Sequence, residues 1–214
     1  MTENEKQAYS AVRGEFAEDI ETVGGCDENG CNIEHLLIEA DNSEGGCFVR
    51  DSGARTEFPS GAVRDMREGK GRCDLMPLEV VAAYIQTHMS ESEALVLYNI
   101  AYFQYGHDIT YLDRALDIFC RIHPDYMSNI PTMFLEVAKQ FEDGAKKYGD
   151  SNWQKGVHIY CYIDSAVRHY LKWLRGDHDE PHDRAFVWNI LCCIWEAGYS
   201  PRAAAFADDK EDAV

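Results

Sequence analysis

The stretch HDRAFVWNILCCIWEAG, residues 182–198, decides how the rest of the chain folds. Apolar side chains lie on nearly every side of the helix that this stretch predicts, a pattern typical of a helix at the centre of a bundle. Cys192 and Cys193 fall within the apolar run, where we expect free thiols that pack as small core side chains. A buried Asn189 needs hydrogen-bond partners, so we expect it either to hold a neighbouring helix or to contact a ligand.

Two strongly amphipathic segments precede this central stretch. Over residues 131–148 and again over 158–176, apolar side chains recur at steps of three and four residues, which predicts helices with one buried face each. Gly149 and Gly176 follow these segments, at the position where helices commonly end. Three earlier helices are predicted over residues 77–89, 90–106 and 110–123. Since strand-like alternation is nearly absent, the sequence predicts an all-α fold, a helical bundle with an irregular acidic N-terminal appendage.

The distribution of charge divides the chain into three parts. Residues 1–51 hold 13 acidic side chains against 3 basic ones, and we interpret them as an acidic, Cys-containing appendage. Residues 52–200 form the helical domain, with an insertion at about 90–130, and residues 201–214 form an acidic tail. Within the domain, residues 52–76 are a basic island that we expect to be an ordered loop. Such an island indicates either a local anionic ligand or ordinary salt pairing at the surface.

Composition excludes several classes of function. A net charge of −18 repels the phosphates of DNA and RNA, so we expect no nucleic acid as a partner. No apolar run approaches the roughly 18 residues that a membrane span needs, so no membrane partner is expected. The first residues, MTENEKQAYS, lack the basic start and apolar core of a signal peptide. We therefore expect a cytoplasmic protein whose eight cysteines stay reduced.

Acidic side chains gather at two places that flank the amphipathic segments. Glu136, Gln140 and Asp143 share one face of the helix predicted over 131–148. The turn GDHDEPHD, residues 176–183, carries the carboxylates Asp177, Asp179, Glu180 and Asp183. Carboxylates that converge from two helices repel one another, and a divalent cation relieves the repulsion; oxygen ligands favour Mg²⁺ or Mn²⁺. The alternative is that these acids only stabilise the start of a helix.

Other combinations of polar residues are less specific. Asp164 and Arg168 have the spacing of an ion pair within one helix, and the adjacent His169 is interpreted as a hydrogen-bonded core histidine. The doublet His182–Asp183 is similar to that of HD-type phosphohydrolases, but the chain lacks suitably spaced further ligands. A zinc site made by Cys26, Cys31, His35 and Cys47 is an alternative whose spacing matches no common pattern.

The segment REGKGR, residues 67–72, is not a P-loop, because the glycine four residues before Gly69–Lys70 is missing and Gly71 replaces the required Ser or Thr. It can nevertheless present Lys70, Arg72 and backbone N–H groups to a polyphosphate.

Three stretches together resemble the phage-borne dATP/dGTP diphosphohydrolase-like proteins, which are related to the MazG-like all-α nucleoside triphosphate pyrophosphohydrolases. These are SGARTEFPSGAVRDMREGKGRCDLMPLEV, LEVAKQFEDGAKKYGDSNWQKG and AVRHYLKWLRGD with PHDRAFVWN, all within about residues 52–196. The resemblance implies a hydrolase that uses Mg²⁺ (or Mn²⁺) to cleave a purine nucleoside triphosphate into a monophosphate and pyrophosphate. It also implies a homo-oligomer, and a host-cytoplasmic location if a phage encodes the chain.

Site residues follow from the motifs and the resemblance together. We expect Glu136, Glu180 and Asp183 to be catalytic, and the same three with Asp179 to hold the metal. We expect the substrate to be bound by Arg55, Lys70, Arg72, Lys147, Tyr148, Asn152, Trp153, Arg168, His169 and Asn189. The chain departs from the wider superfamily because Lys139 stands three residues after Glu136, where a second glutamate is usual. Two alternatives therefore stay open, a non-catalytic protein that sequesters or senses a nucleotide and a helical interaction protein.

Overall fold

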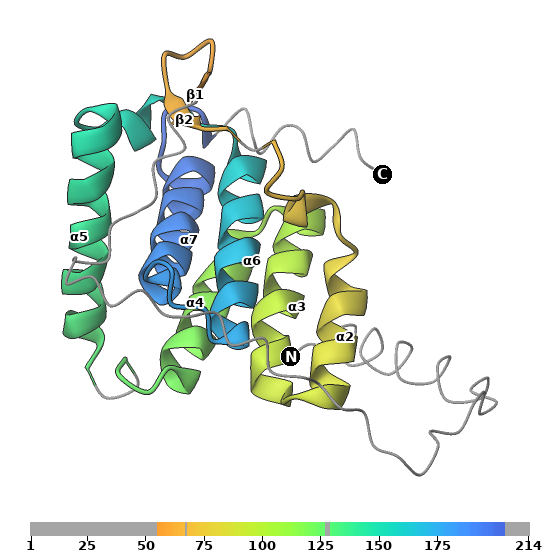
Figure 1. The fold of residues 1–214 in the computed structure, drawn as a ribbon. Coiled ribbons are helices and arrows are strands. Elements are labelled where there is room, and N and C mark those ends of the chain that lie inside the picture. Colours follow the sequence, from red (N-terminus) through yellow and green to blue (C-terminus); the bar gives the residue numbers. More distant parts are fainter. Residues whose placement is uncertain (1–54, 67, 127–128, 204–214) are drawn as a thin grey trace. The chain divides into compact units, whose positions relative to one another are not determined.

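A computed structural model describes residues 55–66, 68–126 and 129–203, all within one compact unit, Gly45–Val214. The predicted appendage of residues 1–51, its zinc alternative and most of the acidic tail lie outside the described residues. The described chain is an all-α bundle, which confirms the predicted fold class (Figure 1). Its helices are α2 (Leu78–His88), α3 (Glu91–Gly106), α4 (Ile109–Ile122), α5 (Ile130–Tyr148), α6 (Ile159–Arg175) and α7 (His182–Gly198).

Local sequence signals mark the ends of these helices. Ser90 accepts a hydrogen bond from the backbone N–H of Glu93 at 3.2 Å and donates to its carboxylate at 2.7 Å, so a capping box starts α3. Gly149 and Gly176 end α5 and α6 with φ angles of 85° and 81°. Glycine adopts such angles without the steric penalty that a Cβ brings.

Helix α7 lies at the centre of the bundle, as its all-round apolar sequence predicts. It contacts α4, α5 and α6, and Phe186, Ile190, Cys192 and Cys193 on it are fully buried. Both cysteines are free thiols, which confirms their expected role as core residues. Helix α3 in turn packs against α2 and α4 (Figure 1). None of the helices in the described part of the chain is both long and apolar enough to cross a membrane.

The expectation of a loop over residues 52–76 is wrong for part of that segment. Strands β1 (Arg55–Glu57) and β2 (Val63–Asp65) form an antiparallel hairpin in which Thr56 faces Arg64. A 3₁₀ turn, η1 (Cys73–Leu75), then packs against α6. Strands of three residues are too short for a visible alternation of side chains. They form because side chains of distant helices hold them in place.

Candidate functional site

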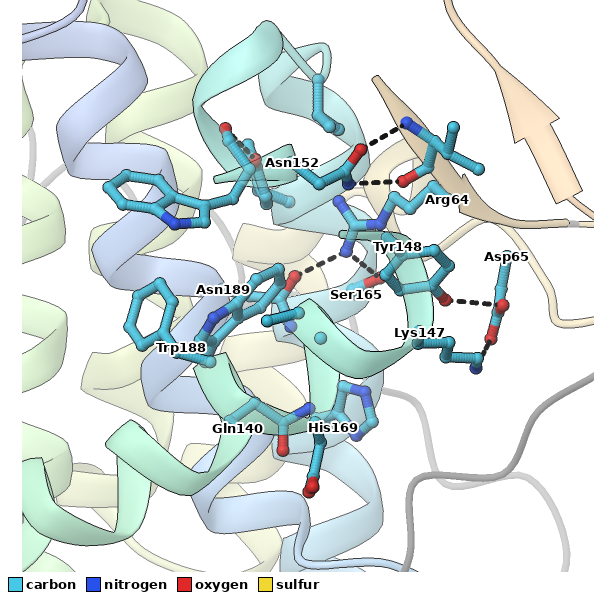
Figure 2. A pocket seen from close by; sticks show the side chains of 18 of the residues that line it. Arg64, Asp65, Gln140, Lys147, Tyr148, Asn152, Ser165, His169, Trp188 and Asn189 are labelled. Atoms are coloured by element: carbon cyan, nitrogen blue, oxygen red, sulfur yellow. Dashed lines mark hydrogen bonds and ion pairs between the residues drawn. The ribbon is translucent and has the colours of Figure 1, made fainter. Parts of the chain in front are cut away.

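A pocket of about 710 Å³ opens between α5, α6 and α7 on one side and strand β2 on the other. Its volume lies in the range of sites that hold small molecules. The aromatic part of its wall comes from Phe141, Tyr148, Trp153, Tyr162 and Trp188, of which Figure 2 labels Tyr148 and Trp188. Cationic side chains stand beside these rings, contributed by Arg64, Lys70, Lys147, Arg168 and Lys172. The pocket therefore combines flat apolar surfaces with positive charge.

Asn152 holds the hairpin at the edge of this pocket. It lies in the short 3₁₀ helix η2 (Asn152–Lys155), and its side chain is buried. Its amide donates to the carbonyl of Val63 at 2.7 Å and accepts from the N–H of Val63 at 2.9 Å (Figure 2). The Asn152 side chain thus makes the two backbone hydrogen bonds to Val63 that a second neighbouring strand would make. Trp153 packs edge-on against Phe141.

Asp65 of β2 gathers the basic side chains at the end of α5. Its carboxylate accepts hydrogen bonds from Lys147 at 2.8 Å and from the Tyr148 hydroxyl at 2.6 Å (Figure 2). Arg55 donates to the same carboxylate at 2.9 Å, and Lys70 lies 3.9 Å from it. Burial by itself raises the pKa of Asp65, but the hydrogen bonds from Lys147 and Tyr148 and the nearby positive charges lower it overall. Asp65 is therefore ionised at neutral pH and offsets part of the positive charge of Lys147.

Arg64 points into the pocket from β2 and is held there by two helices. Its Nη2 donates to Ser165 of α6 at 3.0 Å and to Asn189 of α7 at 2.7 Å (Figure 2). Its guanidinium carbon lies 4.8 Å from the centre of the Tyr162 ring. Asn189 accepts this bond from Arg64, donates to the carbonyl of Ala185 in its own helix, and lines the pocket. It therefore anchors the hairpin, whereas the sequence offered a neighbouring helix as one of its expected partners.

Two buried donors in the pocket have no hydrogen-bond acceptor among the described residues. They are Nη1 of Arg64 and Nε1 of Trp188. A buried donor without an acceptor is destabilising by about 1–3 kcal/mol, and both residues lie on the pocket wall. Neither residue belongs to a motif that marks it as functional in the sequence. Arg64 was one of five bases in the basic island, and Trp188 looked like a core aromatic residue.

The expected ion pair of Asp164 and Arg168 is present within α6. The Asp164 carboxylate also accepts a hydrogen bond from the N–H of Cys73 at 2.8 Å, and Arg168 donates through Nε to the carbonyl of Lys70 at 3.3 Å. The pair therefore fastens the chain after the hairpin onto α6. Only 1% of the Asp164 side chain is exposed, and 16% of the Arg168 side chain.

A cluster of two histidines and two carboxylates lies where the pocket meets the start of α7. Nδ1 of His169 lies 3.0 Å from Nδ1 of His182, whose Nε2 lies 2.8 Å from Asp179. Burial and nearby positive charges lower the pKa of His169 to about 3, so its imidazole is neutral at physiological pH. Burial raises the pKa of Asp179, but hydrogen bonds from His182 and Lys172 outweigh this and bring it to about 2. His169, Glu180 and His182 form a group that could hold a metal ion.

The pocket brings together most of the residues that the sequence analysis selected. Those on its wall are Lys70, Lys147, Tyr148, Asn152, Trp153, Arg168, His169, Asp179, Glu180 and Asn189. Arg55 does not line it but lies over the Tyr148 ring, with 4.8 Å from the guanidinium carbon to the ring centre. Arg72 is paired with Asp74 at 2.6 Å.

Two expected metal ligands, Glu136 and Asp183, do not line the pocket. Glu136 is partly exposed on α5 and paired with Lys139 at 2.5 Å. Asp183 accepts a hydrogen bond from the Tyr126 hydroxyl at 2.6 Å and lies 3.3 Å from Nε2 of His123. Of the four expected metal ligands, Asp179 and Glu180 line the pocket, and Glu136 and Asp183 do not.

Comparison with known proteins gives one finding that names an activity. A family model described as dATP/dGTP diphosphohydrolase, N-terminal, matches residues 121–204, which confirms the resemblance over that segment. The matched segment includes α5, α6 and α7, the three helices that form one side of the pocket. Neither the curated proteins nor the solved structures contain a match to the chain.

Proposed function

We propose that residues 121–204 carry the N-terminal region of the dATP/dGTP diphosphohydrolase family. From this premise, the chain hydrolyses purine nucleoside triphosphates. Its products are a nucleoside monophosphate and pyrophosphate. The observation that carries the proposal is the pocket, which sets aromatic rings beside cations and contains two buried donors that have no acceptor among the described residues. A purine nucleotide has what such a site requires, a flat base with acceptor atoms and a polyphosphate chain.

Within the pocket, we assign different chemical tasks to different walls. Lys70, Arg168 and Lys172 offer positive charge to the phosphates, where it would neutralise the charge that builds up as the α–β bond breaks. Arg64 and Trp188 offer hydrogen bonds to an acceptor edge of the substrate. The carboxylates Asp179 and Glu180 would orient the attacking water and contribute to holding a divalent cation.

A divalent cation, Mg²⁺ or Mn²⁺, remains part of the proposal. When bound, such an ion polarises phosphate oxygens and lowers the pKa of coordinated water. The expected set of four carboxylates does not fit around one ion in the pocket, because Glu136 and Asp183 do not line it. No step of the reaction is therefore assigned to those two side chains.

The experiment that tests the proposal measures pyrophosphate release by the purified full-length chain from a panel of common NTPs and dNTPs, with Mg²⁺ or Mn²⁺ present. We expect release from purine nucleotides, with dATP and dGTP tested first. Glu180→Gln should lower the rate at least tenfold, in line with the contribution of a general base. Glu142→Gln is the matched control, since Glu142 is exposed and paired with Lys146 on the surface of α5. If no nucleotide yields pyrophosphate, the hydrolase proposal fails.

A second candidate function is a protein that binds a purine nucleotide without hydrolysing it. Two observations favour it, the Lys139 at the place of a second glutamate and the offset of the charge of Lys147 by Asp65. Nucleotides would then raise the melting temperature without turnover, and a chelator would not change the shift.

Trp188→Phe removes one buried donor and keeps an aromatic ring in the wall. We expect nucleotide affinity to fall roughly three- to tenfold, the loss of one hydrogen bond between neutral groups, with thermal stability unchanged or slightly higher. Isothermal titration calorimetry with a poorly hydrolysed purine nucleotide analogue measures the change. Trp173→Phe is the control, because Trp173 packs against Phe119 and does not line the pocket. Equal losses in both variants would contradict the assigned role of Nε1.

A further inference from the structure

We propose that His169, Glu180 and His182 bind a divalent transition-metal ion, in the class of Mn²⁺, Co²⁺ and Zn²⁺, at the wall of the pocket. The role of this ion in hydrolysis rests on the proposed function, whereas its binding rests on the geometry alone. Imidazole and carboxylate groups take the place of the all-carboxylate site that the sequence analysis expected.

The three ligand atoms converge. Nδ1 of His169 and Nδ1 of His182 are 3.0 Å apart, and each lies 3.6 Å from the same oxygen of Glu180. Two nitrogens bound to one ion at about 2.0–2.1 Å each are separated by roughly 3–3.5 Å in a tetrahedral arrangement. The observed separations are close to the edges of such a coordination shell.

Glu180 gives an independent indication of a cation. About 16% of its side chain is exposed, and no hydrogen bond to its carboxylate exists within the described residues. The nearest polar partners are the two imidazole nitrogens, and 3.6 Å is too long for a hydrogen bond. A carboxylate that is largely removed from water needs compensation for its charge. A metal ion between the three groups provides it.

Asp179 fixes His182 in the orientation that a metal ligand requires. The 2.8 Å contact from Nε2 of His182 to Asp179 places the ring proton on Nε2, which leaves the lone pair of Nδ1 facing His169 and Glu180. Carboxylate–histidine–metal arrangements of this kind are the usual support for a ligating histidine. Lys172 holds Asp179 from the other side at 3.2 Å.

A hydrogen bond between the two imidazoles would also span 3.0 Å, but it would leave the Glu180 carboxylate without a hydrogen-bond partner among residues 55–66, 68–126 and 129–203. The metal accounts for all three groups together.

Access and ligand chemistry point to the same class of ion. His169 and Glu180 line the pocket, while the His182 side chain is 1% exposed and lies behind them. An ion held here would therefore face the space assigned to the substrate. Imidazole nitrogens suit Zn²⁺ and Co²⁺ well and bind Mn²⁺ more weakly, whereas Mg²⁺ strongly prefers oxygen and retains its water.

The test is metal binding by the metal-free full-length chain in the absence of nucleotide. Calorimetric titration with Co²⁺ should give one site per chain, bound at least tenfold more tightly than Mg²⁺, with a visible absorption spectrum that reports nitrogen ligation. His169→Gln and Glu180→Gln should each weaken Co²⁺ binding by tenfold or more, and Asp179→Asn by roughly ten- to a hundredfold. His178→Gln is the matched control, since His178 is exposed in the same turn. Within the part of the chain that the structure describes, Glu180→Gln removes no hydrogen bond, so this variant should fold.

Equal affinities for Co²⁺ and Mg²⁺, or an equal loss in His178→Gln, would overturn the site. The outcome is separable from that of the hydrolase proposal. Tight Co²⁺ binding without pyrophosphate release leaves the metal site standing and removes the reaction. Pyrophosphate release in a chain that fails to bind Co²⁺ supports the hydrolase proposal and overturns the metal site.

Discussion

Arg64→Lys is expected to weaken binding of a purine nucleoside triphosphate by about ten- to a hundredfold. The guanidinium of Arg64 donates through Nη2 to Ser165 and Asn189, while its buried Nη1 has no acceptor among the described residues. Lysine keeps the positive charge but has no planar fork, so it cannot hold both partners and also reach the ligand. Losing a hydrogen bond from a charged donor changes binding by about 1.5–3 kcal/mol, which corresponds to the stated range.

The measurement is calorimetric titration with a poorly hydrolysed analogue, alongside a thermal melt. Arg114→Lys is the matched control, because Arg114 also lies over an aromatic ring, that of Tyr111 at 5.3 Å, but on α4 away from the pocket. This control should bind nucleotide as the unchanged chain does. If Arg64→Lys binds equally well, Nη1 does not contact the ligand. The salt dependence of binding should stay similar in the two variants, because neither changes the net charge.

Arg168→Met is expected to lower the free energy of unfolding by about 3–5 kcal/mol, the effect of leaving one member of a buried ion pair without the other. Asp164 is almost completely buried, so removing Arg168 takes a charged hydrogen-bond partner away from a carboxylate that has little access to water. Methionine is similar in length to the apolar stem of arginine, so the loss of packing is small. Urea denaturation followed by circular dichroism measures the change.

Two further variants separate the buried charge from other effects. Asp164→Asn combined with Arg168→Met also removes the buried negative charge of Asp164 and keeps an acceptor for the N–H of Cys73. The double variant should therefore recover most of the lost stability. Arg121→Met breaks the ion pair of Arg121 with Asp117, whose side chains are 73% and 59% exposed. It should change the stability by less than about 1 kcal/mol. Losses of similar size in Arg168→Met and Arg121→Met would contradict the importance of burial.

Much of the fold could be predicted because its signals are local. The steps of three and four residues in α5 and α6, the capping box at Ser90 and the glycines after both helices each act within a few positions. The ion pair of Asp164 and Arg168 was predictable for the same reason, since one turn of a helix fixes its spacing. The hairpin was missed because its strands take their partners from residues about 90 to 125 positions away.

Part of the site depends on contacts that spacing does not reveal. Asn152 looked like a ligand residue, but its side chain clamps the backbone of Val63. Arg64 gains its role from Ser165 and Asn189, which lie on two different helices. In the sequence, His169 looked like a core histidine. In the structure, it lies beside His182 and Glu180, which belong to α7 and to the turn before it.

The sequence by itself determined the helical class, the central place of α7 and the group of motifs at the ends of α5 and α6. Each of these depends on which residues follow one another, and helix geometry converts that order directly into faces and ends. Only the tertiary structure decided which polar groups meet: Asp65 with Lys147, Arg64 with Asn189, and two imidazoles with one carboxylate. Such pairs form where separate elements cross, and the crossing is fixed by the packing of the whole core, in which every buried side chain takes part.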